Sequence, residues 1–558
     1  MLNHQSHSLI MPTTFPCLPP ELVLLIMENN SLRDLYNLST TCHAFRILAH
    51  TDRQYWLGAS DFDSLALPIG HISSDFTLKL LVRLVARTVK FAEQIRGNKI
   101  CNPRGYTAYG PTRANNDIAE ESLLEGPYRY AQLSGDSWYL MTQKSPFFRG
   151  KAFIRRARPG WEDISCVLDL SPLAKHCSLA GPGCTLGGGR VVLACLESFE
   201  MDYLNEHPRH IDCSHLRLME VQFPNENEPP TAPKLALSIV VKLRAAARDV
   251  QFFEHFVVSD SFVWDHGVGW QVVNVKTLRC ANLMFPKDLL FQETYKEMTL
   301  PHEIRLYVSL RLAVVWRQSV TSRGIVAMHH VARLPDFLFK GDESSLLDMR
   351  DGILTCKDVN VEIFSTDTFI RRHMRSSVEL DLASPPIGAR FLQYTLVPAY
   401  KRFPNETSPP IKIWNFHSLY LLPTNELKSY PSRSVDCTGI NTNYCRDALG
   451  AVRYRGLLKP GQEFTLFFLN HENTRLESRN FRCPIIAGVQ HFTGLTYDES
   501  RGIILMEASM ENSVDKRMFR VNYADDERSM LTENHSAAGR LNWLQEWFYS
   551  AKRLVVHG

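Results

Sequence analysis

The 558-residue sequence lacks long hydrophobic runs and has no excess of charge of one sign. No apolar stretch reaches the roughly 18 residues that suggest a membrane-spanning helix. Lys and Arg total 62 against 59 Asp and Glu, which leaves a formal net charge of +3. This balance gives no global electrostatic argument for a nucleic-acid partner. The short basic clusters at Arg155-Arg156 and Arg371-Arg372 are not interleaved with aromatic residues. We therefore expect neither membrane nor nucleic-acid binding.

The cysteines lack the regular spacing of a disulfide framework. Their number, 13, is odd, and they are scattered along the chain. Met1 to Thr14 has no basic start followed by a hydrophobic stretch, so no signal peptide is expected. Both features favour a reducing compartment, and we expect a cytoplasmic or nuclear protein.

Catalytic and ligand-binding motifs are also missing. The sequence contains no Gly-x-Ser-x-Gly, His-Glu-x-x-His or phosphate-loop pattern. Gly187-Gly188-Gly189 precedes the β-rich run Arg190 to Leu196 rather than a helix, so it predicts a mobile loop between strands instead of a dinucleotide site. Asp212-Cys213-Ser214-His215 has no second ligand pair at zinc spacing. We expect no cofactor and no metal.

The N-terminal region predicts a small helical cluster. Leu18, Leu22, Leu25 and Ile26 recur at steps of three and four residues, which places them on one helix face. Asn29-Asn30-Ser31 favours a cap or turn. One second helix is expected to follow, with an apolar face formed by Leu35, Leu38, Cys42, Phe45 and Leu48. Such short helices bury little area alone and must dock either on the chain's next domain or on a partner.

A more specific pattern overlaps these helices in residues 15–58. It consists of Leu18-Pro19-Pro20-Glu21-Leu22, Ile26, Asp34-Leu35, Leu38-Ser39, Cys42-His43, Phe45, Leu48 and Trp56. This pattern resembles an F-box, and the spacing from Ile26 to Asp34-Leu35 fits without a gap. One departure is Asn30, where a Leu is usual, and it predicts reduced affinity for an adaptor.

The resemblance implies binding to a Skp-type adaptor and, through it, to a cullin-RING ubiquitin ligase. The implied adaptor-binding residues are Leu18, Pro19, Leu22, Ile26, Leu35, Leu38, Cys42, Phe45 and Trp56. In this interpretation the Leu18-Pro19 end and the Leu35–Cys42 stretch lie closest to the adaptor, and Trp56 braces the module.

Residues 59–100 are expected to form a helical linker, and residues 101–136 an irregular one. Within 74–96 the apolar side is formed by Leu80, Leu81, Leu84, Val85 and Val89. A basic stripe at Lys79, Arg83, Arg87 and Lys90 is either a solvated face or a contact for an acidic partner. Gly and Pro punctuate 101–136 without a period.

Residues 137–530 predict a large all-β domain, because short β-rich runs alternate with Gly, Pro, Asn and Asp clusters. Blades of about 40–45 residues favour an irregular β-propeller over stacked sandwiches or a leucine-rich array. Val263-Trp264-Asp265 and Leu495 to Gly502 resemble propeller turns. Residues 538–558 predict an amphipathic helix, with Leu541, Leu544, Trp547 and Phe548 at helical steps.

The predicted fold class is therefore α+β, with a small N-terminal helical F-box module before a large all-β domain. This architecture resembles a group of fungal F-box proteins. The expected function is a non-enzymatic substrate receptor of an SCF-type (Skp–cullin–F-box) ubiquitin ligase, with the β domain binding a protein substrate. Two alternatives stay open: an adaptor-independent interaction scaffold with a vestigial F-box, and a hydrolytic propeller with paired carboxylates in its central channel.

Overall fold

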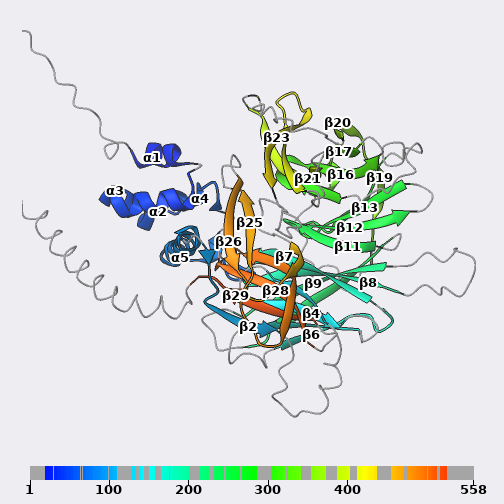
Figure 1. Cartoon of the computed structure of the whole chain (residues 1–558), viewed down its shortest axis with the longest axis horizontal. Coiled ribbons are helices and arrows are strands. Elements are labelled where there is room, and N and C mark those ends of the chain that lie inside the picture. The colour runs from blue at the N-terminus through cyan, green and yellow to red at the C-terminus, as the bar shows by residue number, and fades with distance from the viewer. Residues whose placement is uncertain are drawn as a thin grey trace, which may run out of the picture.

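A computed structural model shows helices in the N-terminal part of the chain and strands after them (Figure 1). The structure describes residues 19–28, 30–62, 65, 67–97, 100–109, 128–133, 138–143, 150–156, 165–174, 176–199, 214–224, 231–243, 247–263, 267–285, 303–321, 324–340, 353–372, 386, 388–401, 411–436, 454–469, 476–498, 501–511 and 516–524. The predicted fold class, a small helical module followed by a large all-β region, is confirmed.

The helical part contains α1 (Pro20–Met27), α2 (Leu32–Thr41), α3 (His43–Thr51), α4 (Gln54–Leu57), a 3₁₀ turn η3 (Ser73–Asp75) and α5 (Leu78–Gly97). The expectation of one second helix is wrong. Cys42 adopts an extended conformation, φ −131° and ψ 134°, and divides that stretch into α2 and α3. The break turns Phe45 and Ala49 of α3 into the same apolar core as Leu35 of α2.

Helix α5 completes this core. Its residues Leu81, Leu84, Val85 and Val89 are buried against the first four helices. The short helices therefore dock on the next part of their own chain, which supplies the area that they cannot bury alone. Arg53 reinforces the contact, since its guanidinium donates hydrogen bonds to the carbonyl oxygens of Ser73 (2.7 Å) and Phe76.

The strands of the described residues form seven sheets, which we number I to VII along the chain. Sheet I contains β3 (Tyr128–Gln132), β4 (Trp138–Gln143), β5 (Lys151–Arg156) and β6 (Ser165–Asp169). Sheet II contains β7 (His176–Gly187), β8 (Arg190–Ser198), β9 (Ser214–Gln222), β10 (Lys234–Lys242) and β18 (Ile353–Thr355). Sheet III contains β11 (Ala247–Phe253), β12 (Phe256–Val263), β13 (Gly267–Asn274), β14 (Arg279–Met284) and β19 (Lys357–Asn360).

The remaining sheets follow in the same direction. Sheet IV contains β15 (Glu303–Tyr307), β16 (Leu312–Thr321), β17 (Gly324–Arg333) and β20 (Ile363–Arg372), with the 3₁₀ turns η4 (Val308–Leu310) and η5 (Asp336–Phe339). Sheet V contains β21 (Arg390–Lys401), β22 (Ile411–Leu421) and β23 (Leu427–Asp436). Sheet VI contains β1 (Ile100–Cys101), β25 (Glu463–Leu469) and β26 (Leu476–Arg482). Sheet VII contains β2 (Gly105–Tyr109), β24 (Tyr454–Leu458), β27 (Val489–Asp498), β28 (Ile503–Met510) and β29 (Lys516–Asn522).

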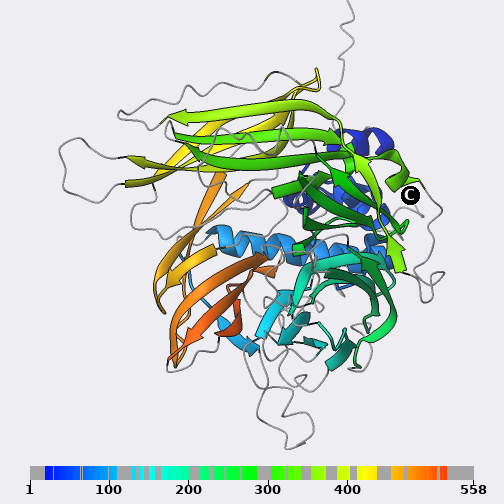
Figure 2. The ribbon, with the colours of Figure 1, turned by 90° about the vertical axis from the view of Figure 1, so that its right-hand side faces the viewer.

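Sheets I to V pack face to face in series. Separate apolar clusters join sheet I to II, II to III, III to IV and IV to V. Two further clusters join sheet I to VII and sheet VI to VII. The sheets can be followed around the molecule from teal through green and yellow to orange (Figure 2). This serial stacking is propeller-like, although the described residues do not show a closed ring.

The expectation of an irregular linker over 101–136 is wrong where strands form. Gly105–Tyr109 pairs antiparallel with β29 at the other end of the β region, and Tyr128–Gln132 begins sheet I. Strand β1 pairs parallel with β26. Short segments punctuated by Gly and Pro carry little periodicity, and the pairing partners of β1 and β2 lie far away in the sequence (for example Gly105 and Asn522). The sequence pattern therefore could not reveal them.

The glycine-rich turn joins the helical part to the β region. Gly187-Gly188-Gly189, predicted as a mobile loop, forms the tight turn between β7 and β8. All three have positive φ, of 92°, 61° and 81°. The amide of Gly189 donates to the carbonyl oxygen of Gly70 at 3.0 Å, and the amide of Gly188 donates to Asp75 Oδ2 at 2.8 Å. We call this contact the glycine clasp.

Asp75 is the acceptor at the centre of the clasp. Its carboxylate also accepts from the amide of Ile72 at 2.9 Å and lies 3.3 Å from His71 Nδ1. Burial by itself raises the pKa of Asp75, but the hydrogen bonds from the Ile72 and Gly188 amides and the nearby His71 outweigh it, so the pKa is lowered. The charged carboxylate therefore favours the docked arrangement.

Apolar contacts extend the same interface. Ile69 belongs to the cluster between sheets I and II, and Ile95 of α5 belongs to the cluster between sheets VI and VII. Arg501 donates to the carbonyl oxygen of Leu67 at 2.8 Å. The helical part is thus packed against several sheets of the β region.

Two predicted features lie outside the described residues. These are the amphipathic helix at 538–558 and the Trp264-Asp265 turn, whose flanking strands β12 and β13 do pair antiparallel. Of the turn predicted at Leu495 to Gly502, residues 495–498 lie in β27 and residues 501–502 directly precede β28, whereas residues 499–500 lie outside the described residues.

Replacing Gly70 by Ala is expected to destabilise the protein. A Cβ at Gly70 would lie 2.4 Å from the carbonyl carbon of Gly189, and the residue has φ +75°. Such a clash between backbones, added to the strained φ, should cost about 2–3 kcal/mol. Urea unfolding of the purified chain measures the loss. Gly105→Ala is the matched control, because its Cβ would meet nothing within 4 Å. Equal unfolding midpoints for the two variants would contradict the role of the clasp.

Candidate functional site

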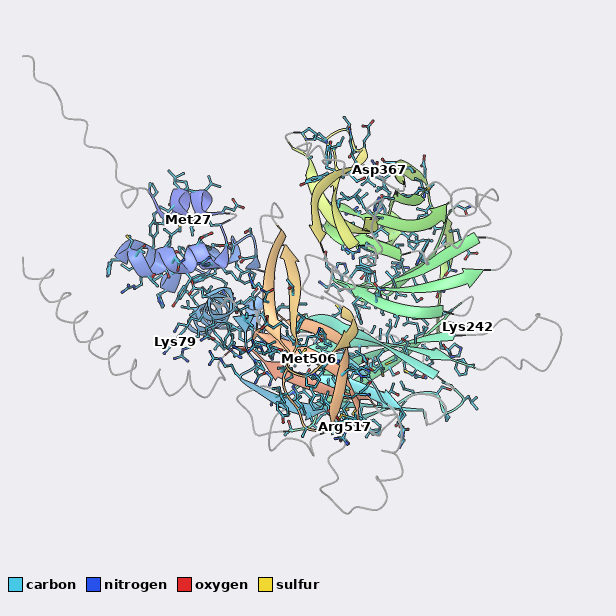
Figure 3. The ribbon with its side chains drawn as sticks, viewed as in Figure 1. Met27, Lys79, Lys242, Asp367, Met506 and Arg517 are labelled. Carbon is cyan, nitrogen blue, oxygen red and sulfur yellow. The ribbon has the colours of Figure 1, made fainter. Side chains whose placement is uncertain are left out.

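Helix α1 has apolar residues on both of its sides. Val23 and Met27 are buried in the helical core, whereas Leu22, Leu25 and Ile26 are 47%, 65% and 51% exposed. The exposed three lie at relative positions 0, 3 and 4, so they share one face. We call Leu22, Leu25 and Ile26 the exposed α1 face. Figure 3 places Met27, and with it α1, on the side of the molecule that projects away from the sheets.

A short helix with this composition needs a strong start and a defined end. Pro20 occupies the first turn, where its missing N–H costs nothing, and Pro19 precedes it in an extended conformation. At the other end Asn30 donates from its side chain to the carbonyl oxygen of Met27 at 3.0 Å. The carbonyl oxygen of Asn30 accepts from the amide of Ser60 at 2.9 Å. The residue that departs from the F-box pattern therefore has a local structural role: it caps α1 and ties its end to the loop after α4.

Helices α2 and α3 share one apolar core with α1. Ser31 caps α2 by accepting from the amide of Asp34 at 3.1 Å. Leu35 is fully buried, whereas Leu38 and Cys42 are half-buried near the end of the helix. On α3, Phe45 points into the core and Ile47 points outward, with 45% of it exposed.

Tyr55 and Trp56 of α4 lock the module together. The Tyr55 hydroxyl donates to the carbonyl oxygen of Leu35 at 2.7 Å, and the Trp56 indole N–H donates to the carbonyl oxygen of Ala49 at 2.8 Å. Their rings meet edge to face, with centroids 4.8 Å apart. Burial, with a smaller contribution from Cys42, raises the pKa of Tyr55 well above its ordinary value, so the hydroxyl stays a donor. These bonds fix the relative positions of α2, α3 and α4.

The structure divides the residues predicted to bind an adaptor into three groups. Pro19, Leu22 and Ile26 are exposed; Leu38 and Cys42 are half-buried; Leu35, Phe45 and Trp56 belong to the core of the module. Leu18 lies outside the described residues. In this arrangement the buried residues can support a binding surface but cannot form it.

Two exposed apolar residues were not among those predicted. Leu25 is the most exposed member of the exposed α1 face, and Ile47 stands apart on α3. The periodicity of α1 already grouped Leu25 with Leu22 and Ile26, so the sequence did contain a signal for it. Ile47 lies two residues after Phe45, which turns it away from the buried side of a helix, but nothing local distinguishes such a position from ordinary surface.

The basic stripe on α5 is largely solvent-facing. Lys79, Arg83 and Lys90 are exposed, and Arg87 is half-buried with its guanidinium 5.4 Å from the ring centroid of Phe91. Near the end of the helix Glu93 pairs with Arg33 of α2 at 3.3 Å. The stripe borders the helical module and is one of its electrostatic features.

The β region shows polar contacts both within and between its sheets. Glu197 accepts from Arg217 Nε at 2.9 Å and Nη2 at 3.1 Å, and from the amide of Ser171 at 2.6 Å. Asp367 of β20 accepts from the amide and the hydroxyl of Ser429 on β23, which links sheets IV and V. Because these polar groups have hydrogen-bond partners, the contacts are typical of structural interactions rather than of a reactive centre. Among the described residues, no group of three or more His, Cys, Asp or Glu is arranged to hold a metal ion.

The helices of the described part of the chain include none that is long and apolar enough to cross a membrane.

Comparison with known proteins finds one family match, and it falls on the N-terminal helices. Residues 15–57 match the model of the F-box-like domain, in the place where the sequence pattern resembles an F-box. No curated protein sequence matches the chain. The family match covers the helical module and leaves the β region unassigned.

Solved structures resemble the chain only distantly. A Trypanosoma rangeli sialidase in complex with sialic acid has 6% identity and a TM-score of 0.27, covering 79% of this chain and 60% of its own. The parainfluenza virus 5 hemagglutinin-neuraminidase ectodomain has 9% identity and a TM-score of 0.28, covering 78% and 88%. The Vanderwaltozyma polyspora Nup133 β-propeller domain has 9% identity and a TM-score of 0.21, covering 71% and 98%. The chain thus spans less than two thirds of the sialidase, and scores this low carry no argument about activity.

Replacing Tyr55 by Phe is expected to loosen the helical module. The change removes only the hydroxyl that bonds to Leu35, and with it the side-chain donor to that buried carbonyl oxygen. A loss of about 1–2 kcal/mol in the free energy of unfolding should follow. The measurement is urea unfolding followed by circular dichroism, with Tyr106→Phe as control because Tyr106 is 50% exposed. A Tyr55→Phe variant as stable as the control would show that the bond does not hold the module.

Proposed function

We propose that the chain is a substrate receptor of an SCF-type ubiquitin ligase, and that the exposed α1 face binds the Skp-type adaptor. The observation that carries the proposal is the coincidence of this face with the F-box-like match at residues 15–57. The proposed receptor is not catalytic and acts in the cytoplasm or nucleus.

The distribution of exposed apolar side chains supports a partner at this module. The described residues include ten exposed large hydrophobic side chains, and four of them lie within the F-box-like segment: Leu22, Leu25, Ile26 and Ile47. Single exposed apolar residues are ordinary, but three on one face of an eight-residue helix form a cluster that favours burial in an interface. Residues central to an interface carry most of its binding energy.

The proposed interface has contacting and supporting residues. Pro19, Leu22 and Ile26, together with Leu25, would contact the adaptor, and Leu38 and Cys42 would lie at its edge. Leu35, Phe45 and Trp56 would act indirectly, by holding α1 against α2 and α4. Asn30 already fulfils a capping role on α1, so the departure from the family pattern does not by itself leave the module without a defined shape.

The β region would hold the protein substrate. Ubiquitin transfer then proceeds by proximity, because a substrate held near the conjugating enzyme reacts as in a nearly unimolecular step. The glycine clasp and the burial of Ile69 and Ile95 among the sheets support this role. They pack the adaptor-binding module against the β region, so a substrate bound there would be presented in a defined orientation.

Placing charge on the exposed α1 face is expected to weaken adaptor binding without unfolding the module. Leu25→Asp and Ile26→Asp each put a carboxylate into the proposed apolar contact, and each should weaken binding by about 2 kcal/mol, roughly 30-fold. Binding of the purified chain to a purified Skp-type adaptor is measured by calorimetry. Ile485→Asp is the matched control, since Ile485 is 80% exposed and lies in the β region.

The same experiment separates the alternatives. If folded wild-type chain does not bind the adaptor, the proposal fails and the chain is an adaptor-independent scaffold. If wild type binds but the α1 variants bind equally well, the adaptor uses another surface. Circular dichroism of each variant shows whether the module is intact, which a charge at the fully buried Leu35 would not guarantee.

A further inference from the structure

The segment that connects two strands of sheet IV leaves that sheet and pairs with two other sheets. Strand β17 ends at Arg333 and β20 begins at Ile363, both in sheet IV. Between them β18 pairs parallel with β10 of sheet II, and β19 pairs parallel with β14 of sheet III. We call residues 353–360 the strap. Lys242, the register partner of Thr355, marks its position on the side of the β region away from the helices (Figure 3).

The strap brings two cysteines to the same register position in neighbouring strands. In the ladder between β14 and β19, Ala281 pairs with Lys357 and Asn282 pairs with Asp358. Continued back by one residue, this register puts Cys280 beside Cys356. Neighbouring strands lie about 4.7–4.9 Å apart, which falls within the range of roughly 4.4–6.8 Å between the Cα atoms of a disulfide. Residues at the same register position of a parallel ladder point to the same face.

The surroundings of the two thiols agree with this geometry. Cys280 is buried in the apolar cluster between sheets II and III, and Cys356 packs against the same cluster from a half-buried position. Neither forms a disulfide in the structure. The thiol of Cys356 hydrogen-bonds to Cys280, which lowers the pKa of Cys280 against the opposing effect of burial. The same bond, together with burial, raises the pKa of Cys356.

This pairing resembles a nucleophile and its resolving partner more than a metal site. The Cys356 thiol is hydrogen-bonded to Cys280, so the partner thiol already lies in contact with the one whose pKa is lowered. A zinc site needs about four ligands, and no group of three or more candidate ligands occurs in the described part of the chain. The nearby polar side chains, Gln271 beside Cys356 and Asn282 bonded to Asp358 at 2.7 Å, offer no further thiolate or imidazole.

We propose that Cys280 and Cys356 form a reversible disulfide, which forms when a peroxide oxidises the two thiols and is reduced again by a thiol reductant. The Cys280 thiolate attacks a peroxide oxygen, the O–O bond breaks, and a sulfenic acid and water form once the leaving oxygen takes up a proton. The sulfur of Cys356 then attacks the Cys280 sulfur, the S–O bond breaks, and a second water leaves with the proton of Cys356. Two electrons from the thiols reduce one hydrogen peroxide to two waters.

The bond would fasten the strap to sheet III by a covalent link. In the reduced chain, the short strands β18 and β19 hold the strap through backbone pairing over three and four register positions. The disulfide closes a loop of 77 residues, from 280 to 356 inclusive, that also contains β15, β16 and β17 of sheet IV. It therefore restricts both local opening of the strap and the unfolded chain. The inference does not depend on the proposed ligase function.

The test uses the full chain, purified with its thiols reduced. It is treated with stoichiometric hydrogen peroxide, then alkylated and digested for peptide mass spectrometry. We expect a peptide that joins Cys280 to Cys356, a loss of two alkylatable thiols and reversal by dithiothreitol. Hydrogen exchange within residues 353–360 should slow in the oxidised chain, and the midpoint of urea unfolding should rise.

Three variants make the result specific. Cys280→Ser and Cys356→Ser should each abolish the cross-link and the slowed exchange, whereas Cys195→Ser should keep both, since Cys195 is buried in the cluster between sheets I and II. A wild-type chain in which both thiols remain alkylatable after peroxide would overturn the proposal. So would overoxidation of Cys280 without a cross-link, or a cross-link from either residue to a different cysteine.

Discussion

The approach of Gly70 to Gly189, close enough for a direct backbone hydrogen bond, is the contact on which the arrangement of the two parts depends. A side chain at Gly70 would occupy the space of the Gly189 carbonyl group. The Asp75 carboxylate adds two hydrogen bonds to this contact. It accepts one from the amide of Ile72 in the helical part and one from the amide of Gly188 in the β region. Because this contact involves backbone atoms on both sides, it sets position and direction more tightly than apolar packing alone.

The helical module shows how a few buried residues leave others available for binding. Val23 and Met27 anchor α1, and the bonds made by Tyr55 and Trp56 hold the helices beneath it. With the shape secured from within, Leu22, Leu25 and Ile26 are not needed for the core of the module. Exposing these apolar side chains to water is unfavourable in the free chain. Burying them against a partner would recover that free energy.

The β region combines serial stacking with one departure from it. Sheets I to V stack in series, sheet VII packs on sheets I and VI, and the first strands of the region join sheets VI and VII, which are built otherwise from its last strands. The strap crosses this order by pairing with sheets II and III between two strands of sheet IV. Short parallel pairs at sheet edges are weak compared with the long antiparallel ladders, so a covalent link there would change local stability more than one within a ladder.

Local sequence determined the kinds of element and the motif. Helical steps in 18–48 and 74–96, β-rich runs after 137 and the F-box pattern at 15–58 were all readable, because periodicity and turn chemistry depend on neighbouring residues. The tertiary structure decided which face of α1 is covered, that 105–109 pairs with 518–522, and that Cys280 lies beside Cys356. Periodicity shows which residues share a face, but what covers that face depends on surfaces supplied by distant parts of the chain.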